Sequence, residues 1–219
     1  MQIAIDGPAG AGKSTIAKAA AHSCGMIYVD TGAIYRSVAY ALIQGGTDTE
    51  DTDAVGSALT GIVPSLAFVG GEQHVYVNGE DVSDKIRTPE ISMTTSHISA
   101  YPCVRAFLLE TQRRIAREND VIMDGRDIGT VVLPDADVKI FLTASPECRA
   151  KRRYDELIAK GEQVTYEQTL ADVIGRDKQD TERETAPLRQ ADDAVLVDTS
   201  DLTLEQSIDA VTELIRRAR

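Results

Sequence analysis

The sequence predicts an α/β fold in which helices flank a five-stranded parallel sheet. Three observations support this fold class. Short apolar runs alternate with helical patterns along most of the 219 residues, which are enough for one domain of this kind. Two of these runs, 121–124 and 138–142, are apolar except for Asp124 and Lys139, as is typical of parallel strands covered on both faces. A glycine-rich loop directly follows the first apolar run, so a strand, a loop and a helix are expected in that order.

The first third of the chain continues the alternation. The run 3–5 is expected to be a strand, and a run of strong helix formers follows the glycine-rich loop. A second strand is expected at 26–29, followed by a helix that Thr31 can cap and that stops at Gly45. The acidic stretch 47–57 is interpreted as a solvated loop that leads into a weak helix.

The alternation is interrupted between about 60 and 100. The runs 66–69 and 74–77 have the pattern of a hairpin, and Asn78-Gly79 after them is a tight-turn signal. We therefore expect a small antiparallel insertion. The remaining elements expected are, in order, helices at about 88–99 and 103–118, the strands 121–124 and 138–142, a helix with Pro146 in its first position, a helix with a capping box at Thr165, a strand at 195–197 and a final helix with a capping box at Thr203.

Composition and charge exclude several classes of protein. No window approaches 18 consecutive apolar residues, and Met1-Gln2 leads straight into a strand, so neither a membrane span nor a signal peptide is expected. Cys24, Cys103 and Cys148 are scattered and form no C-x-x-C pattern, which indicates a reducing, cytoplasmic environment. The formal net charge of −12 disfavours a nucleic-acid-binding protein, and we expect a monomer that binds small molecules.

The glycine-rich loop matches the pattern G-x-x-x-x-G-K-[ST] between a strand and a helix. Its glycines allow positive φ and close approach of backbone N–H groups to an anion, and the helix N-terminus adds partial positive charge. Lys13 is placed to reach terminal phosphates, and the Ser14 hydroxyl can bind Mg²⁺. The sequence therefore predicts a nucleoside triphosphate site made by Gly7, Pro8, Ala9, Gly10, Ala11, Gly12, Lys13, Ser14 and Thr15.

Arginines gather in four places despite the acidic net charge. Arg36 lies one turn into the second helix, and Arg126 follows the strand 121–124 at its carboxyl end, where open α/β sheets bind ligands. A cluster at 149–153 crowds one helix. Arg176, Asp180 and Arg183 are spaced i, i+4, i+7, which predicts one shared helical face. For these last two groups a solvated helix surface is the competing interpretation.

Phosphoryl transfer explains why several arginines would converge. Its transition state spreads negative charge over the transferring oxygens, so catalysis depends on alignment and fixed positive charge. The planar guanidinium fork grips two oxygens at once, which suits this task better than lysine does. Water must be excluded from the triphosphate, so a lid with its own arginines is expected.

Six motifs are distributed in order along the chain: the phosphate loop, D-T-G-A-I-Y-R at 30–36, G-E-D-V-S at 79–83, I-R-T at 86–88, D-G-R-D-I-G-T-V-V at 124–132 and Arg176-Asp177. Together they closely resemble the bacterial-type cytidylate (CMP) kinase family over essentially the whole chain. The resemblance implies a nucleoside monophosphate kinase fold of the P-loop type, with a core of 1–30, 106–149 and 166–219. It also implies a monophosphate-binding insertion of about 31–105 and a lid of about 150–165.

The resemblance further implies transfer of the γ-phosphoryl group of ATP to CMP or dCMP with Mg²⁺. Lys13, Arg126, Arg176 and Arg183 would act in catalysis, Arg153 in the lid would approach ATP, and Ser14 would hold Mg²⁺. The residues implied for CMP are Thr31, Tyr35, Arg36, Ser96, Arg105, Arg126, Asp127, Arg176, Asp180 and Arg183, of which Ser96, Arg105 and Asp127 would read the cytosine edge. Gln179 and Thr181 stand where some relatives carry further arginines, which reduces the positive charge of that helix.

Three alternatives remain open at this level. A kinase for another monophosphate or for shikimate would share the phosphate loop. A GTP-driven switch would need an N-K-x-D motif, whereas the asparagines, Asn78 and Asn119, are followed by Gly and Asp. A non-catalytic nucleotide-binding module is disfavoured by the intact Lys13, Arg126 and Arg183.

Overall fold

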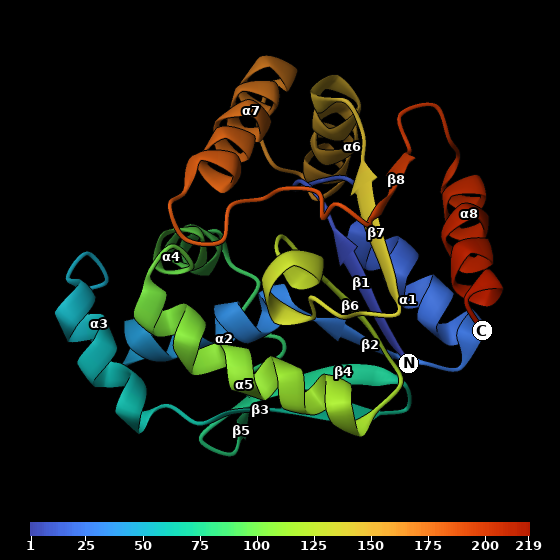
Figure 1. Ribbon diagram of the computed structural model, residues 1–219. Coiled ribbons are helices and arrows are strands. Elements are labelled where there is room, and N and C mark those ends of the chain that lie inside the picture. Colours follow the sequence, from blue (N-terminus) through green and yellow to red (C-terminus); the bar gives the residue numbers. More distant parts are fainter. The chain divides into compact units, whose positions relative to one another are not determined.

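The computed structural model describes all 219 residues, and the chain divides into two compact units (Figure 1). The first unit contains residues 1–26 and 121–219, and the second contains residues 27–120. The five-stranded sheet has the order β2-β6-β1-β7-β8, with four strands in the first unit and β2 in the second. This confirms the predicted five-stranded sheet of an α/β fold.

The first unit is built on parallel strands with helices packed around them. Its strands are β1 (Gln2–Asp6), β6 (Val121–Gly125), β7 (Val138–Thr143) and β8 (Val195–Asp198), all joined in parallel. The register aligns Ile5 of β1 with Asp124 of β6 and Ile140 of β7. Its helices are α1 (Lys13–Cys24), α6 (Pro146–Ala159), α7 (Tyr166–Glu182) and α8 (Leu204–Arg217), together with a single π-helical segment, Ile128–Val132.

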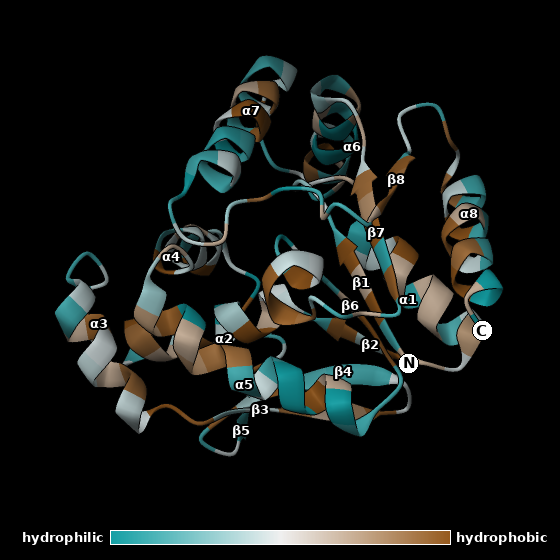
Figure 2. Cartoon of the chain, viewed as in Figure 1, coloured by the Kyte–Doolittle hydropathy of each residue, from teal (hydrophilic) through white to brown (hydrophobic).

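The core of this unit follows from its apolar strands. Ile3, Ile5, Ile122, Met123 and Ile140 are fully buried, and Figure 2 shows β1 in brown. Helix α1 packs against α8, and α6 packs beside α7. The carboxyl ends of β1 and β6 therefore present their polar residues at one edge of a rigid sheet.

The second unit combines a small antiparallel sheet with helices. The sheet order β3-β4-β5 confirms the predicted hairpin, which pairs Leu66 with Val75. Asn78 and Gly79 both adopt positive φ and form the predicted tight turn. The elements of the unit are β2 (Ile27–Asp30), α2 (Thr31–Gln44), α3 (Thr52–Ala58), a 3₁₀ turn (Leu59–Gly61), β3 (Pro64–Val69), β4 (Glu72–Val77), β5 (Glu80–Asp81), α4 (Pro89–Ile98) and α5 (Pro102–Glu118).

Most predicted helix boundaries are confirmed, including the capping boxes at Thr165 and Thr203. The predicted cap at Thr31 is wrong. Asp30 is the N-cap of α2, because its carboxylate accepts the backbone N–H of Ala33 at 2.9 Å while Thr31 is already helical. None of the helices is long and apolar enough to cross a bilayer.

The prediction that Arg176, Asp180 and Arg183 share one helical face is wrong for Arg183. Helix α7 ends at Glu182, and Arg183 is extended, with φ −61° and ψ 138°. Its Nε donates to the carbonyl of Ala186 at 2.7 Å, and Pro187 then prevents the helix from resuming. Arg183 is therefore aimed by a turn that follows the helix.

Candidate phosphate and nucleotide site

The loop after β1 has the backbone of an anion-binding loop. Gly7, Gly10 and Gly12 have φ of 150°, 77° and 88°, a region that favours glycine. A Cβ at Gly7 would lie 1.9 Å from the carbonyl oxygen of Leu142, so no other residue fits there. Helix α1 begins at Lys13 with Gly12 as its N-cap, and no side chain caps its first N–H groups. The predicted positive φ of the loop glycines is confirmed.

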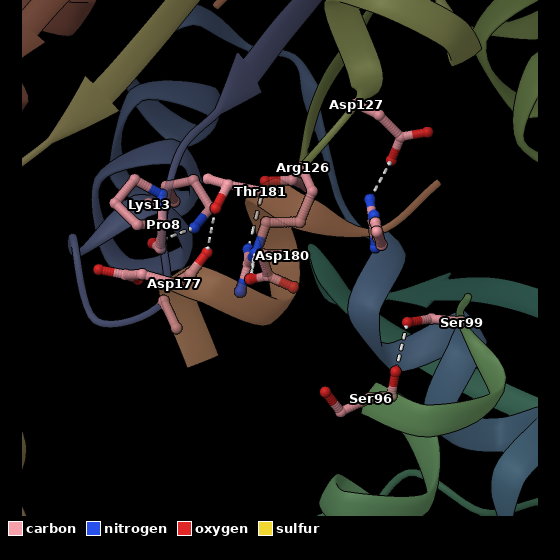
Figure 3. Close-up of polar contacts among 12 residues, drawn as sticks. Pro8, Lys13, Ser96, Ser99, Arg126, Asp127, Asp177, Asp180 and Thr181 are labelled. Atoms are coloured by element: carbon pink, nitrogen blue, oxygen red, sulfur yellow. Dashed lines mark hydrogen bonds and ion pairs between the residues drawn. The ribbon is translucent and has the colours of Figure 1, made fainter. Parts of the chain in front are cut away.

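Lys13 is buried at the base of this loop (Figure 3). Its Nζ donates to the carbonyl of Pro8 at 2.8 Å. Burial, and after it the positive charge of Arg126, lowers the pKa of Lys13 from its ordinary 10.5 to about 7, although three carboxylates (Asp124, Asp6 and Asp180) oppose the shift. Arg126 therefore lies close enough to Lys13 for its positive charge to act on the lysine amine.

A carboxylate stands beside the Ser14 hydroxyl. The Ser14 Oγ donates to Oδ2 of Asp124 at 2.8 Å. Asp124 is buried in β6, in register with Ile5 of β1. Asp124 has no role among the predicted site residues, although its place at the end of an apolar strand is a signal for ligand binding.

A second buried carboxylate, Asp6, holds the segment that follows Arg126. Its two oxygens accept the backbone N–H groups of Ile128 and Gly129, each at 2.7 Å. Burial raises the pKa of Asp6 to about 6, although these two hydrogen bonds act in the opposite direction. Asp6 thereby fixes the start of the π-helical segment Ile128–Val132, which the sequence reasoning did not predict.

Two predicted arginines of the first unit, Arg126 and Arg183, form ion pairs with the predicted carboxylates (Figure 3). Arg126 Nε donates to Oδ2 of Asp180 at 2.7 Å. Arg183 Nη2 lies 3.6 Å from Oδ1 of Asp127, and both side chains are buried. Arg176 is exposed on α7. The structure thus brings Lys13, Arg126 and Asp180 together within the first unit, and Arg183 with Asp127.

The basic cluster at 149–153 divides into two kinds of residue. Arg149 is buried and bonds the phosphate loop and α7, so the solvated-surface interpretation is wrong for it. Arg153 is exposed and pairs with Glu156 at 2.9 Å on the same helix. The sequence pattern could not distinguish them, because only the fold shows which face of α6 is covered.

The second unit holds the other predicted site residues. Arg36 Nη2 pairs with Asp30 at 2.7 Å, and the buried Nε of Arg36 has no hydrogen-bond partner. The guanidinium carbon of Arg105 lies 5.8 Å from the centre of the Tyr35 ring. Arg105 Nη1 donates to the carbonyl of Ser99, whose hydroxyl in turn donates to the Ser96 carbonyl, and Thr31 is buried in the first turn of α2. Tyr35, Ser96 and Arg105 are thus connected within this unit.

A phosphate loop with a buried lysine, next to an arginine that follows a parallel strand and pairs with a carboxylate of α7, defines a phosphotransferase of the phosphate-loop class. The fold agrees: a shikimate kinase structure from Bacteroides thetaiotaomicron matches with a TM-score of 0.51 and 14% identity, covering 99% of this chain and 98% of that one. The chain belongs to the cytidylate kinase family, since the family model described as "Cytidylate kinase" matches residues 3–217.

Similar curated proteins agree with this family assignment. A cytidylate kinase of Geobacter sulfurreducens is 53% identical over 218 residues, which cover 98% of this chain and 92% of that protein. A cytidylate kinase of Carboxydothermus hydrogenoformans is 47% identical over 219 residues, covering 99% and 98%. The resemblance found in the motifs is confirmed at the level of the family.

Proposed function

We propose that this chain is an ATP-dependent (d)CMP kinase, which transfers the γ-phosphoryl group of ATP to CMP or dCMP. One observation carries the proposal beyond family membership. The buried Lys13 has its Nζ on the Pro8 carbonyl at 2.8 Å, and the guanidinium group of Arg126 is held beside it by Asp180 at 2.7 Å (Figure 3). Two cations held together in this way favour an anion that contacts both, and phosphates in transfer between two nucleotides supply it.

The triphosphate end of the site belongs to the phosphate loop. The backbone N–H groups of residues 7–15 other than Pro8, together with the N-terminus of α1, would bind the phosphates, with Lys13 reaching the terminal ones. Arg153, in a lid at about 150–165, would approach ATP when the lid closes. The core would comprise residues 1–30, 106–149 and 166–219, and the monophosphate-binding insertion would comprise about 31–105.

Ser14 and Asp124 fit a magnesium ion. Mg²⁺ prefers oxygen ligands and usually takes one or two protein oxygens, with waters and substrate phosphates completing the shell. A hydroxyl and a carboxylate 2.8 Å apart at the phosphate loop supply that donor set. The ion would neutralise phosphate charge as it develops during transfer. Cys, His and acidic residues form no larger metal-binding cluster in the structure.

The acceptor monophosphate would be bound by arginines. Arg36 has a buried Nε donor without a partner, which a phosphate oxygen would satisfy. In the first unit, Arg126, Arg183 and Arg176 would bind the monophosphate or the transferring group, and Asp180 would contact the sugar. In the second unit, Thr31 and Tyr35 would line the acceptor pocket.

The base would be read by Ser96 and Arg105 of the second unit and by Asp127 of the first. Cytosine offers a 4-amino donor beside the N3 acceptor, so a carboxylate and an arginine complement it. Uracil would present a carbonyl to the carboxylate and a donor to the arginine. A buried polar site of this kind can discriminate by several powers of ten.

The test is a coupled ADP-release assay with ATP, Mg²⁺ and a panel of CMP, dCMP, UMP, AMP, GMP and shikimate. We expect CMP and dCMP to give the highest kcat/KM. Asp127→Asn should reduce the ratio of kcat/KM for CMP to that for UMP, because the charged acceptor for the 4-amino group becomes an amide that can also donate to the uracil carbonyl. Preference for another acceptor would overturn the proposed function. An unchanged ratio in the variant would overturn only the role of Asp127.

A further inference from the structure

We propose that Arg149 is a positioning residue for the ATP phosphates, acting through the Ala9–Gly10 peptide of the phosphate loop. This inference rests on the proposed function. Arg149 lies in the first turn of α6, and its side chain is only 3% exposed. It touches no predicted substrate group, yet it bonds directly to the backbone of the loop that would hold ATP.

All three nitrogens of the guanidinium group have a partner. Nε donates to the carbonyl of Ala144 at 2.8 Å, directly after β7. Nη1 donates both to the carbonyl of Ala9 at 3.0 Å and to Oδ1 of Asp177 at 2.9 Å, and Nη2 donates to Oδ2 of Asp177 at 2.5 Å. One side chain therefore ties the phosphate loop to the end of β7 and to α7. Lysine cannot reproduce this geometry, because it lacks the rigid fork.

The bond to Ala9 fixes the direction of the next N–H group. The Ala9–Gly10 peptide is planar and trans, so the Ala9 carbonyl and the Gly10 N–H point in opposite directions. Holding the carbonyl on Arg149 directs the Gly10 N–H to the other side of the loop, where a phosphate oxygen can accept it. A charged donor on the carbonyl also polarises the amide and strengthens the N–H as a donor.

Packing at Gly10 supports the same role. A Cβ at Gly10 would lie 3.3 Å from the Cβ of Arg149, so the loop backbone rests on the stem of this side chain. Gly10 has φ of 77°, which leaves its peptide orientation to be set by its neighbours rather than by a side chain. Arg149 is the neighbour that makes both the steric contact and the hydrogen bond.

The competing explanation is that the Arg149–Asp177 pair only stabilises the fold. Buried ion pairs are often replaceable by apolar residues of similar volume with little loss of stability, whereas removing one partner is strongly destabilising. The double variant Arg149→Met/Asp177→Leu therefore separates the two roles. It leaves no unpaired charge between α6 and α7, but the Ala9 carbonyl loses its donor.

The experiment measures the Kd of a non-hydrolysable ATP analogue with Mg²⁺ by calorimetry, together with KM for ATP and Tm. We expect Arg149→Lys and the double variant to raise the Kd and KM for ATP about tenfold, as one charge-assisted hydrogen bond acting on the loop would. The double variant should do so with a Tm near that of the wild type. If the double variant does not fold, the Kd of the ATP analogue for Arg149→Lys, measured well below the Tm of that variant, tests the inference.

The matched control is Asp193→Asn. Asp193 is the carboxylate partner of another buried cation, Lys139, at 2.7 Å, and neither residue bonds the phosphate loop. This variant should lower Tm and leave the Kd of the ATP analogue unchanged. Wild-type affinity in the Arg149 variants, or equal affinity loss in the control, would overturn the inference. Failure of the wild type to bind the analogue would instead overturn the proposed function.

Discussion

Proton uptake on ATP binding is the sharpest consequence of the buried Lys13. Burial, and then the charge of Arg126, lowers the pKa of Lys13 to about 7. Triphosphate oxygens placed on Nζ would favour the charged amine and return its pKa toward 10.5 or above. At alkaline pH the binding reaction must therefore take a proton from the buffer to charge this lysine.

The magnitude follows from the two pKa values. With a pKa of about 7 in the nucleotide-free protein, ATP binding takes up about 0.9 proton at about pH 8, about 0.5 at pH 7 and about 0.1 at pH 6. By the same linkage, the Kd for ATP rises about tenfold for each pH unit between about pH 7 and 10, and is nearly flat below. Affinity is thus lost as pH rises, because the neutral amine must first be protonated.

Calorimetry in several buffers measures this uptake, because the observed binding enthalpy changes with the ionisation enthalpy of the buffer and the slope equals the number of protons taken up. Near pH 8 the triphosphate is already fully ionised, so it contributes little. Lys13→Arg is the control, because a guanidinium does not titrate in this range and any binding that remains should show no uptake. A buffer-independent heat at pH 8, with a Kd that is flat up to pH 9, would refute the reasoning.

Three further predictions concern other residues of the first unit. Arg126→Met should lower kcat about 10²–10³-fold without changing the far-UV circular dichroism spectrum. It should also reduce proton uptake near pH 8, because the pKa of Lys13 rises when the neighbouring positive charge is removed. Near-normal turnover of the variant would show that Arg126 has no part in the mechanism. Asp6 has its pKa raised to about 6, so its contribution to the free energy of unfolding falls between about pH 4 and 6 and stays low above. Urea unfolding measures this as the difference in free energy of unfolding between the wild type and Asp6→Asn. That difference should shrink by up to about 3 kcal/mol from pH 4 to 7. A difference that stays constant with pH would contradict the raised pKa of Asp6. Gly7→Ala should prevent folding, since the added Cβ would meet the Leu142 carbonyl. The control Gly175→Ala lies in open space on α7 and should stabilise the folded protein by up to about 1 kcal/mol, as measured by thermal unfolding.

The sheet, the hairpin and most helix ends could be predicted because local physics determines them. Continuous apolar runs require strands covered on both faces, and Asn78-Gly79 requires a tight turn. The N-cap of α2 was wrongly predicted because two neighbouring residues could play the same part. Asp30 and Thr31 are both good N-caps, and only the backbone of Asp30, extended at ψ 95°, places its carboxylate on the Ala33 N–H.

The site was predictable where a motif names its residues and not where a long-range contact defines them. Asp6 and Ile128 are 122 residues apart in sequence, and Arg149 and Ala9 are 140 apart. No spacing rule connects such positions. Arg149 illustrates the limit, because its charge suggested a solvated surface and its burial depends on which face of α6 meets α7.

The acidic net charge and the predicted anion site are reconciled by the partners of the arginines. Arg36, Arg126 and Arg183 each pair with an aspartate of their own unit, namely Asp30, Asp180 and Asp127. These carboxylates neutralise the guanidinium groups and fix their direction, so a phosphate meets donors that are already oriented. The remaining acidic excess adds a repulsive long-range field, and therefore affinity for nucleotides must come from short-range, charge-assisted hydrogen bonds that salt screens weakly. An acidic protein can in this way bind two anions selectively, because only a ligand that fits the oriented guanidinium groups overcomes the general repulsion.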